Sequence, residues 1–159
     1  MFTDLSSNQG ILALLEDIRC ELSVQAGLTN TLDDAVNVPS IPKIAIVSSP
    51  QDYVTTSGTQ IKKEEVDIVA KMVSMGRFHR TFAGSGLYNL AAAVLLPGTI
   101  PNNCSGIKRT TDEQLIRIGH PDGIATVRVR LSAEGNDVDY VGLDRTARRI
   151  MKGELYIPE

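Results

Sequence analysis

Gly84, Ser85 and Gly86 stand directly before an apolar run, residues 87–96, and are well suited to bind an anion. If a helix begins here, its first N–H groups lack backbone partners and carry a partial positive charge. Glycine lets a ligand approach those groups closely, so a carboxylate or a phosphate would suit the position. The alternative is that Ser85 only caps the helix and that the glycines only turn the chain.

Lys43 is a second candidate for contact with a substrate. It lies near the start of a short apolar run, residues 42–48, that opens with a proline. Most lysines at such positions keep their amine in water, and contact with a substrate is the less common alternative. Cys20 and Cys104 lie far apart in the sequence and fit no metal-ligand spacing, so we expect two buried or idle thiols and no metal site. We also expect no cofactor.

The element that presents the three small residues is predicted to be a buried helix. Between residues 87 and 96 only the Tyr88 hydroxyl and the Asn89 amide are polar, so a helix would be apolar nearly all round. Leu90 and Val94 are therefore predicted to be core positions. Other elements must surround such a helix.

Two amphipathic helices are predicted outside it. The first covers residues 11–22, is capped by Ser6, Ser7 or Asn8, ends at Gly27, and has an apolar face of Ile11, Leu15, Ile18 and Leu22. The second begins with Glu64 and Glu65, ends at Gly76, and has an apolar face of Val66, Val69, Ala70 and Val73. Residues 29–41, 51–60 and 101–106 carry turn formers without a sustained period and are predicted to be loops.

Four segments have the pattern of strands, and a fifth ends as one. Residues 42–48 form a short apolar run that is typical of a buried strand. Residues 114–118 and 124–131 flank a turn at 120–123, so we expect a hairpin in which His120 has a surface turn role. Residues 138–143 follow another turn. The last segment, 145–157, is ambiguous because its first half favours a helix and its end favours a strand.

The composition excludes several classes of protein. A chain of 159 residues with 42% hydrophobic and 22% charged residues is expected to fold as one globular domain. The net charge of −3 gives no reason to expect nucleic acid or a membrane surface as a partner. No window approaches the roughly 18 apolar residues of a membrane span, and the first residues do not form a secretory signal, so we expect a cytoplasmic protein.

Five separated phrases of the sequence resemble the PrpF family of 2-methylaconitate cis-trans isomerases, methylitaconate Δ-isomerases and aconitate isomerases. They are SMGRFH at 74–79 with AGSG at 83–86, LPGT at 96–99, IGHPDG at 118–123, and RTARRIMKGELYIP at 145–158. The resemblance implies an α+β, diaminopimelate-epimerase-like fold, in which a curved antiparallel sheet wraps round one central buried helix. It also implies that residues 145–157 form a strand.

The resemblance covers the C-terminal half of such an isomerase. It divides the single domain, residues 1–159, into a leading helix, 1–28, and a body of sheet and central helix, 42–159. The family's catalytic lysine and cysteine lie on the other half, and Ala83 stands where related epimerases carry a second catalytic cysteine. The resemblance therefore implies no catalytic residue on this chain, and we expect the chain alone to be inactive.

What the resemblance implies for this half is the binding of a small unsaturated di- or tricarboxylate. The candidate binding residues are Lys43, Ser74, His79, Arg80, Gly84, Ser85 and Gly86. Cations and N–H donors would hold the carboxylate while negative charge spreads into it during proton transfer. For His79, a structural hydrogen bond to the backbone of the turn is an equally good hypothesis.

Three functional classes stay open at this stage. The chain is one half of an isomerase, or it pairs with itself or with a separately encoded N-terminal half, or it is a carboxylate-binding module without chemistry. The face of residues 11–22 is a candidate interface for the second class. The sequence does not decide between these classes, nor does it identify the acid.

Overall fold

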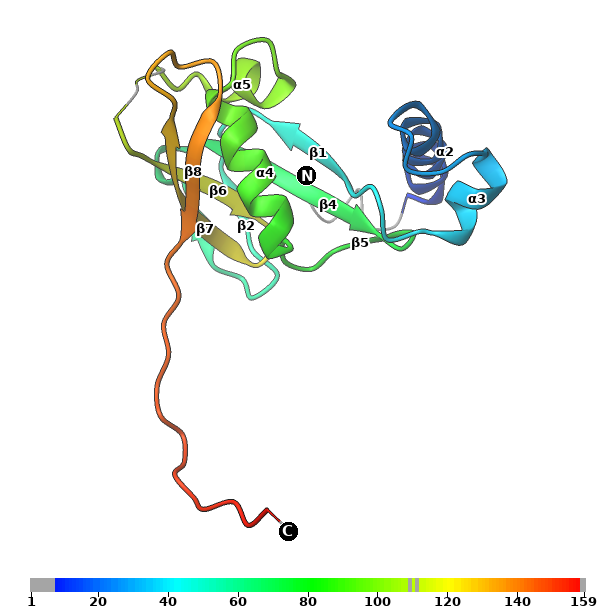
Figure 1. The fold of residues 1–159 in the computed structure, drawn as a ribbon. Helices are drawn as coiled ribbons and strands as arrows, with labels where there is room; N and C mark the ends of the chain where they lie inside the picture. Colours follow the sequence, from blue (N-terminus) through cyan, green and yellow to red (C-terminus); the bar gives the residue numbers. More distant parts are fainter. Residues whose placement is uncertain (1–7, 109, 111, 158–159) are drawn as a thin grey trace.

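The computed structural model describes residues 8–108, 110 and 112–157 of the chain (Figure 1). In chain order its elements are α2 (Gln9–Gln25), α3 (Leu32–Asn37), β1 (Ile44–Ser48), β2 (Tyr53–Val54), β3 (Gln60–Ile61), the 3₁₀ turn η1 (Lys63–Glu65), β4 (Ile68–Ser74), β5 (Arg77–Phe78), α4 (Gly84–Leu95), α5 (Ile100–Ser105), β6 (Gln114–His120), β7 (Gly123–Leu131) and β8 (Val138–Leu143). The fold is α+β, as predicted.

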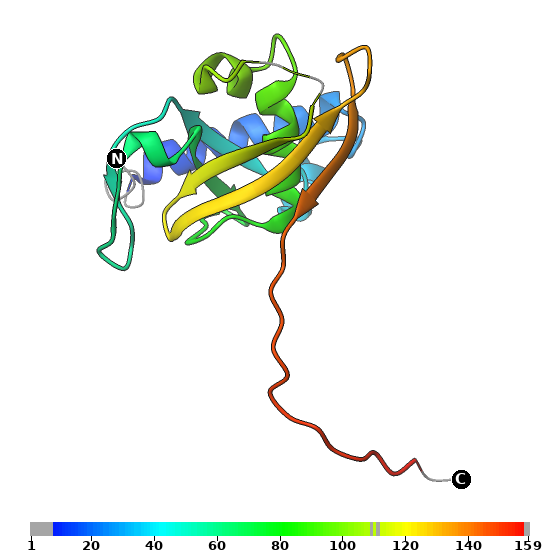
Figure 2. The same cartoon turned by 90° about the vertical axis from the view of Figure 1, so that its left-hand side faces the viewer.

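The main sheet has six strands, and α4 lies across one of its faces (Figure 2). Its order is β1-β4-β6-β7-β8, with β5 paired to β4, while β2 and β3 form a separate ribbon. The pairing of β4 with β6 is parallel, and the other pairs are antiparallel. The sheet is therefore mixed, which corrects the expectation of an antiparallel sheet.

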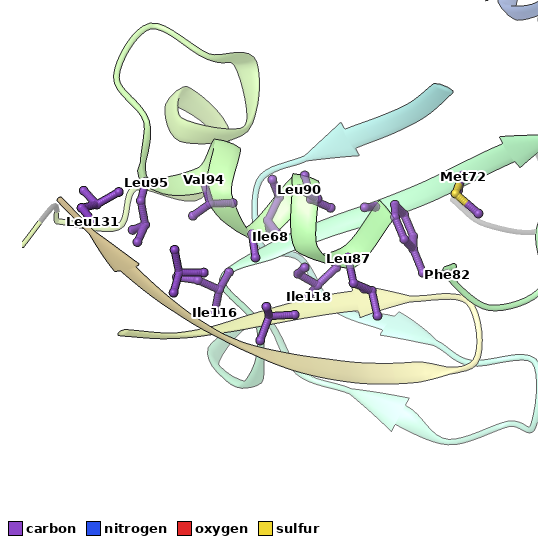
Figure 3. Close-up of a cluster of buried hydrophobic side chains, with 14 residues drawn as sticks. Ile68, Met72, Phe82, Leu87, Leu90, Val94, Leu95, Ile116, Ile118 and Leu131 are labelled. Carbon is purple, nitrogen blue, oxygen red and sulfur yellow. The ribbon is translucent and has the colours of Figure 1, made fainter. Parts of the chain in front are cut away.

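The core lies between α4 and the sheet (Figure 3). Leu90 and Val94 are buried, as predicted, and they pack with side chains of three strands, among them Ile68, Ile116 and Val127. Ser85 and Asn89 lie on the same helix but are exposed. The helix is therefore buried on the side that faces the sheet and open on the other side near its N-terminus.

The predicted helix after Glu65 is wrong, because these residues form η1 and then the strand β4. Every residue of β4 from Ile68 to Val73 is buried, because the strand lies between β1 and β6 and has both faces covered. A strand covered on both faces loses the alternation of polar and apolar residues. The spacing of its valines then matched a helical period by chance.

Two predicted loops each contain a short helix. The Thr31 hydroxyl caps α3 by accepting a hydrogen bond from the Asp34 N–H at 3.1 Å, and the Asp34 carboxylate accepts one from the Thr31 N–H. Thr99 caps α5 by accepting a hydrogen bond from the Asn102 N–H at 3.2 Å, and Gly106 ends that helix with a φ of 65°. Capping side chains give these six-residue helices defined starts, although neither has a visible hydrophobic period.

The C-terminal segment, residues 145–157, is not the strand that the resemblance implied. We call it the tail. It forms no helix or strand among the described residues, and all of it is exposed. Figure 1 shows it leaving the end of β8 and running away from the sheet. A strand requires a neighbouring strand for its hydrogen bonds, and the described chain offers the tail none. The hairpin of β6 and β7 and the strand β8 are confirmed.

The helices α2 and α3 form a helical hairpin, residues 9–41, at one end of the sheet (Figure 1). The α2 cap at Asn8 and the left-handed Gly27 are confirmed, whereas Ser6 and Ser7 lie outside the described residues. The predicted apolar face of α2 is only partly buried. Leu15 is covered, but Ile18 and Leu22 are exposed.

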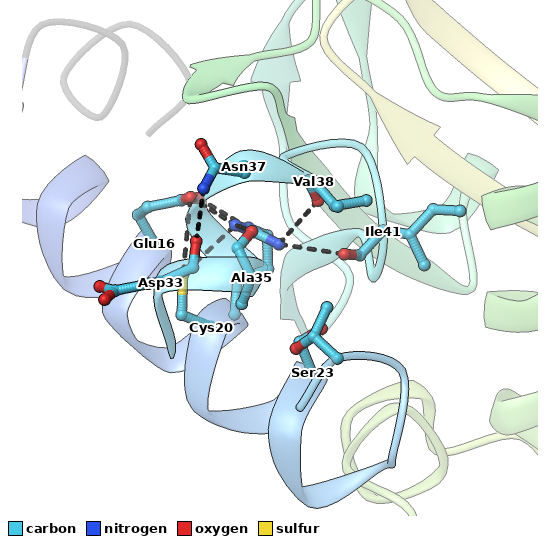
Figure 4. Close-up of polar contacts among 10 residues, drawn as sticks. Glu16, Cys20, Ser23, Asp33, Ala35, Asn37, Val38 and Ile41 are labelled. Carbon is cyan, nitrogen blue, oxygen red and sulfur yellow. Dashed lines mark hydrogen bonds and ion pairs between the residues drawn. The ribbon is translucent and has the colours of Figure 1, made fainter. Parts of the chain in front are cut away.

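The guanidinium of Arg19 joins α2 to the segment that contains α3, and Figure 4 shows its partners Glu16, Ala35, Val38 and Ile41. This side chain is only 2% exposed. It donates to the carbonyl oxygens of Ala35, Val38 and Ile41 at 2.7, 3.3 and 3.0 Å, and to both carboxylate oxygens of Glu16. Arg19 thereby fixes the backbone that leads into β1.

The parallel pair β4–β6 begins at an ion pair between Asp67 and Arg117. Asp67 accepts from the Arg117 backbone N–H at 2.7 Å and from its Nη2 at 2.6 Å. The Asp67 N–H donates in turn to the Arg117 carbonyl oxygen at 2.8 Å. These contacts join two residues that are 50 positions apart in the sequence.

Among the described residues, no helix is long and apolar enough to cross a membrane. Both cysteines are free thiols, as predicted. Cys20 is buried, and burial raises the pKa of its thiol.

Candidate functional site

A cavity of about 690 Å³ opens between the N-terminal half of α4, the start of β1 and the first turn of α5. Its walls are mainly apolar, with Ile44, Met72, Phe82 and Leu90 among them. The polar groups in its lining include Lys43, Ser85 and Asn89. A mostly apolar cavity with a few converging polar groups is the usual form of a small-molecule site.

The N-terminus of α4 reaches this cavity without a side-chain cap. The cap position is Ala83, whose side chain makes no capping hydrogen bond, and Ser85 lies inside the first turn. The hypothesis that Ser85 only caps the helix is therefore wrong. Since the helix has no side-chain cap, the partial positive charge of its first turn is available to an anion at this end.

Lys43 brings a full positive charge to the opposite wall. Its Nζ donates to the Ser40 carbonyl oxygen at 3.0 Å, which uses one of its three N–H groups. It is the one charged residue among the described residues that line the cavity. A lysine and an uncapped helix terminus around a space without carboxylates form a positive environment that favours a carboxylate ligand.

The other predicted site residues are not in the lining of the cavity. Ser74 is the last residue of β4, and Arg80 is exposed in the segment that leads to α4. His79 accepts at Nδ1 from the Thr81 N–H at 3.2 Å, so it makes the structural hydrogen bond that the sequence left as an alternative. Gly84 belongs to the first turn of α4.

Gly86 has a packing reason to be glycine. A Cβ atom at this position would lie 2.9 Å from Cε1 of Phe82 and 3.3 Å from Sδ of Met72. Both side chains also line the cavity. Gly86 therefore lets the first turn of α4 lie directly against the cavity wall.

Sequence reasoning did not identify Asn89 and Arg145 as site residues. Asn89 follows Ser85 by one helical turn and therefore faces the same cavity, which the helical period alone indicates once the helix is placed. Arg145 lies over the helix terminus, where a Cβ atom built on Gly84 would be 3.4 Å from its Nη2. No sequence pattern connects residues 61 positions apart in this way, so only the fold reveals Arg145.

Lys71 and His120 lie outside the cavity, and both have a lowered pKa. Burial lowers the pKa of Lys71, whose Nζ lies 4.6 Å from the centre of the Phe78 ring. Burial also lowers the pKa of His120, against the opposing effect of Asp122. His120 ends β6 and accepts from the Asp122 N–H at 3.2 Å, which confirms its role in the turn. No group of three or more potential metal ligands occurs in the described part of the chain.

The family model described as "PrpF protein" matches residues 1–158 of the chain. The 3-methylitaconate isomerase of Eubacterium barkeri is 39% identical over 155 residues, which is 96% of this chain and 40% of that protein. The 2-methyl-aconitate isomerase of Shewanella oneidensis is 30% identical over 158 residues, 98% of this chain and 39% of that protein. The chain thus spans about two fifths of the length of these curated relatives.

A solved structure supports the same assignment. The crystal structure of methylitaconate-delta-isomerase superposes with a TM-score of 0.83 at 38% identity, over 93% of this chain and 38% of that one. The sequence, along almost its whole length, and the fold therefore both indicate the same family. This chain belongs to the PrpF family.

Proposed function

We propose that this chain forms one wall of the substrate cleft of a PrpF-type isomerase that acts on a small unsaturated di- or tricarboxylate such as aconitate, methylaconitate or methylitaconate. The observation that carries the proposal is the cavity at the uncapped end of α4, with Lys43 and Ser85 in its lining. The names of the relatives supply the class of substrate. We also assign the fold, as part of this proposal, to one diaminopimelate-epimerase-like half.

In this proposal the chain's own residues bind and orient the acid. Lys43 and the first-turn N–H groups of α4 hold one carboxylate, and the Ser85 hydroxyl and Asn89 amide hold further oxygens. Arg145, whose Nη2 lies near Gly84, adds a positive charge at the helix terminus, and Ser74, His79 and Arg80 stay candidate binding residues outside the cavity lining. Removal of a proton from carbon next to a carboxylate spreads negative charge into that carboxylate, and these donors stabilise the charge.

The proton-abstracting group is not assigned to this chain. Abstraction from carbon needs a positioned base with a tuned pKa in a site closed to water. The resemblance places the family's lysine and cysteine on the other half, and Ala83 has no ionisable group. We therefore expect the chain alone to bind a carboxylate without isomerising it.

Binding is tested by following backbone amide NMR shifts during titration with trans-aconitate. Shifts should gather at residues 40–45 and 83–90, with an affinity on the order of millimolar that falls with added salt. Lys43→Met should weaken binding at least about fivefold, whereas Lys63→Met, an exposed lysine away from the cavity, should not change it. Shifts confined to other regions would disprove the site.

Catalysis is tested separately with the purified chain and the isomers of aconitate and methylaconitate. We expect neither isomer conversion nor exchange of substrate hydrogen for deuterium. Turnover that a single change of Lys43 or His79 abolishes would show that a complete catalytic site exists on this chain. Turnover only in the presence of a family N-terminal half would instead support the proposed division of labour.

A further inference from the structure

One wall of the cavity is formed by residues 40–43, which we call the wall segment. All four of its residues line the cavity, and it connects α3 to β1 without belonging to a helix or a strand. It therefore lacks the regular backbone hydrogen bonds that hold a helix or a strand in place. Another part of the chain has to fix this segment if Lys43 is to keep one position.

Arg19 of α2 contacts the backbone of the wall segment and the residues before it. Its Nη1 donates to the Ile41 carbonyl oxygen at 3.0 Å and to the Val38 carbonyl oxygen at 3.3 Å. Its Nη2 donates to the Ala35 carbonyl oxygen of α3 at 2.7 Å. Figure 4 shows the contacts with Val38 and Ile41 as dashed lines. One planar group thus links the wall segment to both helices of the helical hairpin.

The Arg19 guanidinium is itself held in one orientation. Glu16, three residues before it on α2, accepts from its Nε at 2.8 Å and from its Nη2 at 2.6 Å. Two parallel hydrogen bonds of this kind fix the plane of a guanidinium as well as its position. The Arg19 side chain is almost fully buried, and burial strengthens such contacts because the surroundings are less polar than water.

The backbone that Arg19 holds determines where Lys43 can place its amine. The Lys43 Nζ donates to the Ser40 carbonyl oxygen at 3.0 Å. That carbonyl belongs to the peptide group that leads into Ile41, whose own carbonyl oxygen accepts from Arg19. Only Pro42 separates Ile41 from Lys43. A shift of this backbone would therefore move both ends of the lysine side chain.

We propose that Arg19 is a positioning residue for the carboxylate site, because it holds, through the wall segment, the Lys43 amine in place at the cavity. Arg19 is not in the lining of the cavity, so it acts through Lys43 and not on the ligand. A cation that is already ordered binds an anion more tightly, since the ligand does not have to order it. The inference rests on the proposed function and deepens it, since it concerns the same cavity.

A double-mutant cycle tests this link. It compares the dissociation constant of trans-aconitate, measured by the NMR titration, for the wild type, Arg19→Lys, Lys43→Met and the double variant. The substituted side chain keeps a charge beside Glu16 but has no planar fork that reaches three carbonyl oxygens. Arg19→Lys should raise the dissociation constant about threefold, because the ligand must then order one more side chain. In the Lys43→Met background it should cause no further increase.

Two results of this cycle would overturn the inference. Wild-type affinity in Arg19→Lys would show that Lys43 does not depend on Arg19, and an equal increase in both backgrounds would show that Arg19 does not act through Lys43. Thr31→Ala is the matched control, because it removes the α3 cap and leaves the Arg19 contacts in place. It should not change the dissociation constant. An equal loss of affinity in this control would attribute the effect to the stability of the helical hairpin.

The ligand-free variants separate this inference from the proposed function. Backbone amide shifts and hydrogen exchange at residues 40, 41 and 43 should change in Arg19→Lys and stay as in the wild type in Thr31→Ala. A wild-type chain that binds no trans-aconitate would disprove the proposed function, and the ligand-free data alone would then decide whether Arg19 positions Lys43. Unchanged residues 40, 41 and 43 in Arg19→Lys would overturn the inference in either case.

A second variant keeps the test decisive if the helical hairpin of Arg19→Lys does not fold. Glu16→Ala removes the carboxylate that orients the guanidinium but leaves the three carbonyl acceptors of Arg19 in place. It should raise the dissociation constant by less than Arg19→Lys, and again only when Lys43 is present. An increase that persists in the Lys43→Met background would contradict the proposed link.

Discussion

The sheet body, residues 44–143, and the helical hairpin, residues 9–41, are stabilised by different kinds of contact. In the body, aliphatic side chains such as Leu90 and Ile116 meet in a closed apolar core. In the hairpin, the most buried large side chain is that of Arg19, and its hydrogen bonds to backbone oxygens join α2 to the segment after α3. Several apolar side chains of the helical hairpin, such as Ile18 and Leu22, are exposed on its surface.

This difference shows that a helical apolar pattern does not by itself tell whether the side chains are buried within the chain or left exposed on its surface. Along α4 the pattern indicates residues that are buried within the chain itself. Along α2 a similar pattern indicates residues that the chain does not cover. The two regions should accordingly respond to different perturbations.

Replacing Leu90 by Asp should abolish cooperative unfolding of the body. A buried carboxylate without a partner costs several kcal/mol, against a total stability of roughly 5–15 kcal/mol. Thermal melting by circular dichroism measures the effect. Asn89→Asp, one position away on the exposed side, is the matched control and should melt like the wild type. Near-normal melting of the Leu90 variant would place α4 outside the core.

Replacing Arg19 by Met should destabilise the hairpin by about 3–5 kcal/mol while the body stays folded. The carbonyl oxygens of Ala35 and Ile41 lose their donor, and Glu16 loses its partner. Hydrogen exchange should therefore accelerate in α2 and α3 but not in β4. Arg130→Met, which breaks an exposed ion pair with Asp139, should change little. Equal acceleration in β4 would show that the two regions unfold as one unit.

Replacing Gly86 by Ala should lower the stability of the body by about 1–3 kcal/mol. The new methyl group would lie 2.9 Å from Cε1 of Phe82, so the ring or the helix terminus must move. The gain in helix propensity from alanine, up to about 1 kcal/mol, offsets only part of this cost. The melting temperature measures the net effect. Gly153→Ala in the tail meets no atom within 4 Å and serves as the control. A variant as stable as the wild type would contradict the close packing.

Low pH should destabilise the helical hairpin because it protonates the Glu16 carboxylate. Its hydrogen bond with Arg19 lowers the pKa of the Glu16 carboxyl below 4.5. Between that lowered value and 4.5 the unfolded chain binds more protons than the folded one, so the stabilisation is present above pH 4.5 and is lost as pH falls through the folded pKa. Hydrogen exchange in α2 measured from pH 6 to pH 3 should show this loss, and Glu16→Gln should reduce it. An unchanged slope in that variant would assign the effect to other carboxyl groups.

The sequence predicted those elements whose pattern comes from local contacts. The helix α4, the hairpin of β6 and β7, and the cap at Asn8 follow from periodicity, turn residues and capping. β4 was not predicted because burial on both faces removes the alternation that identifies a strand. α5 was missed although Thr99 and Gly106 mark both of its ends, because six residues are too few to show a period.

Some residues of the candidate site could likewise be predicted from local sequence patterns, whereas others are brought together only by the fold. Ser85 and Gly86 were found because they adjoin a recognisable helix, and Lys43 was found because it precedes a recognisable strand. That these residues share one cavity depends on how α4 crosses the sheet near β1, which no local pattern specifies. Arg145 reaches the same helix end from a distant part of the chain, and only the fold brings it there.

The parallel pairing of β4 with β6 has a kinetic consequence. Ile68 pairs with Ile118, so the whole segment that contains α4 and α5 must be enclosed before the first rung of this ladder forms. Closing a loop of that length costs about 3.5 kcal/mol of chain entropy. The ion pair between Asp67 and Arg117 lies at the point where this loop closes. We therefore expect the formation of the β4–β6 pair to limit the rate at which the sheet assembles, because pairings between residues distant in sequence form slowly.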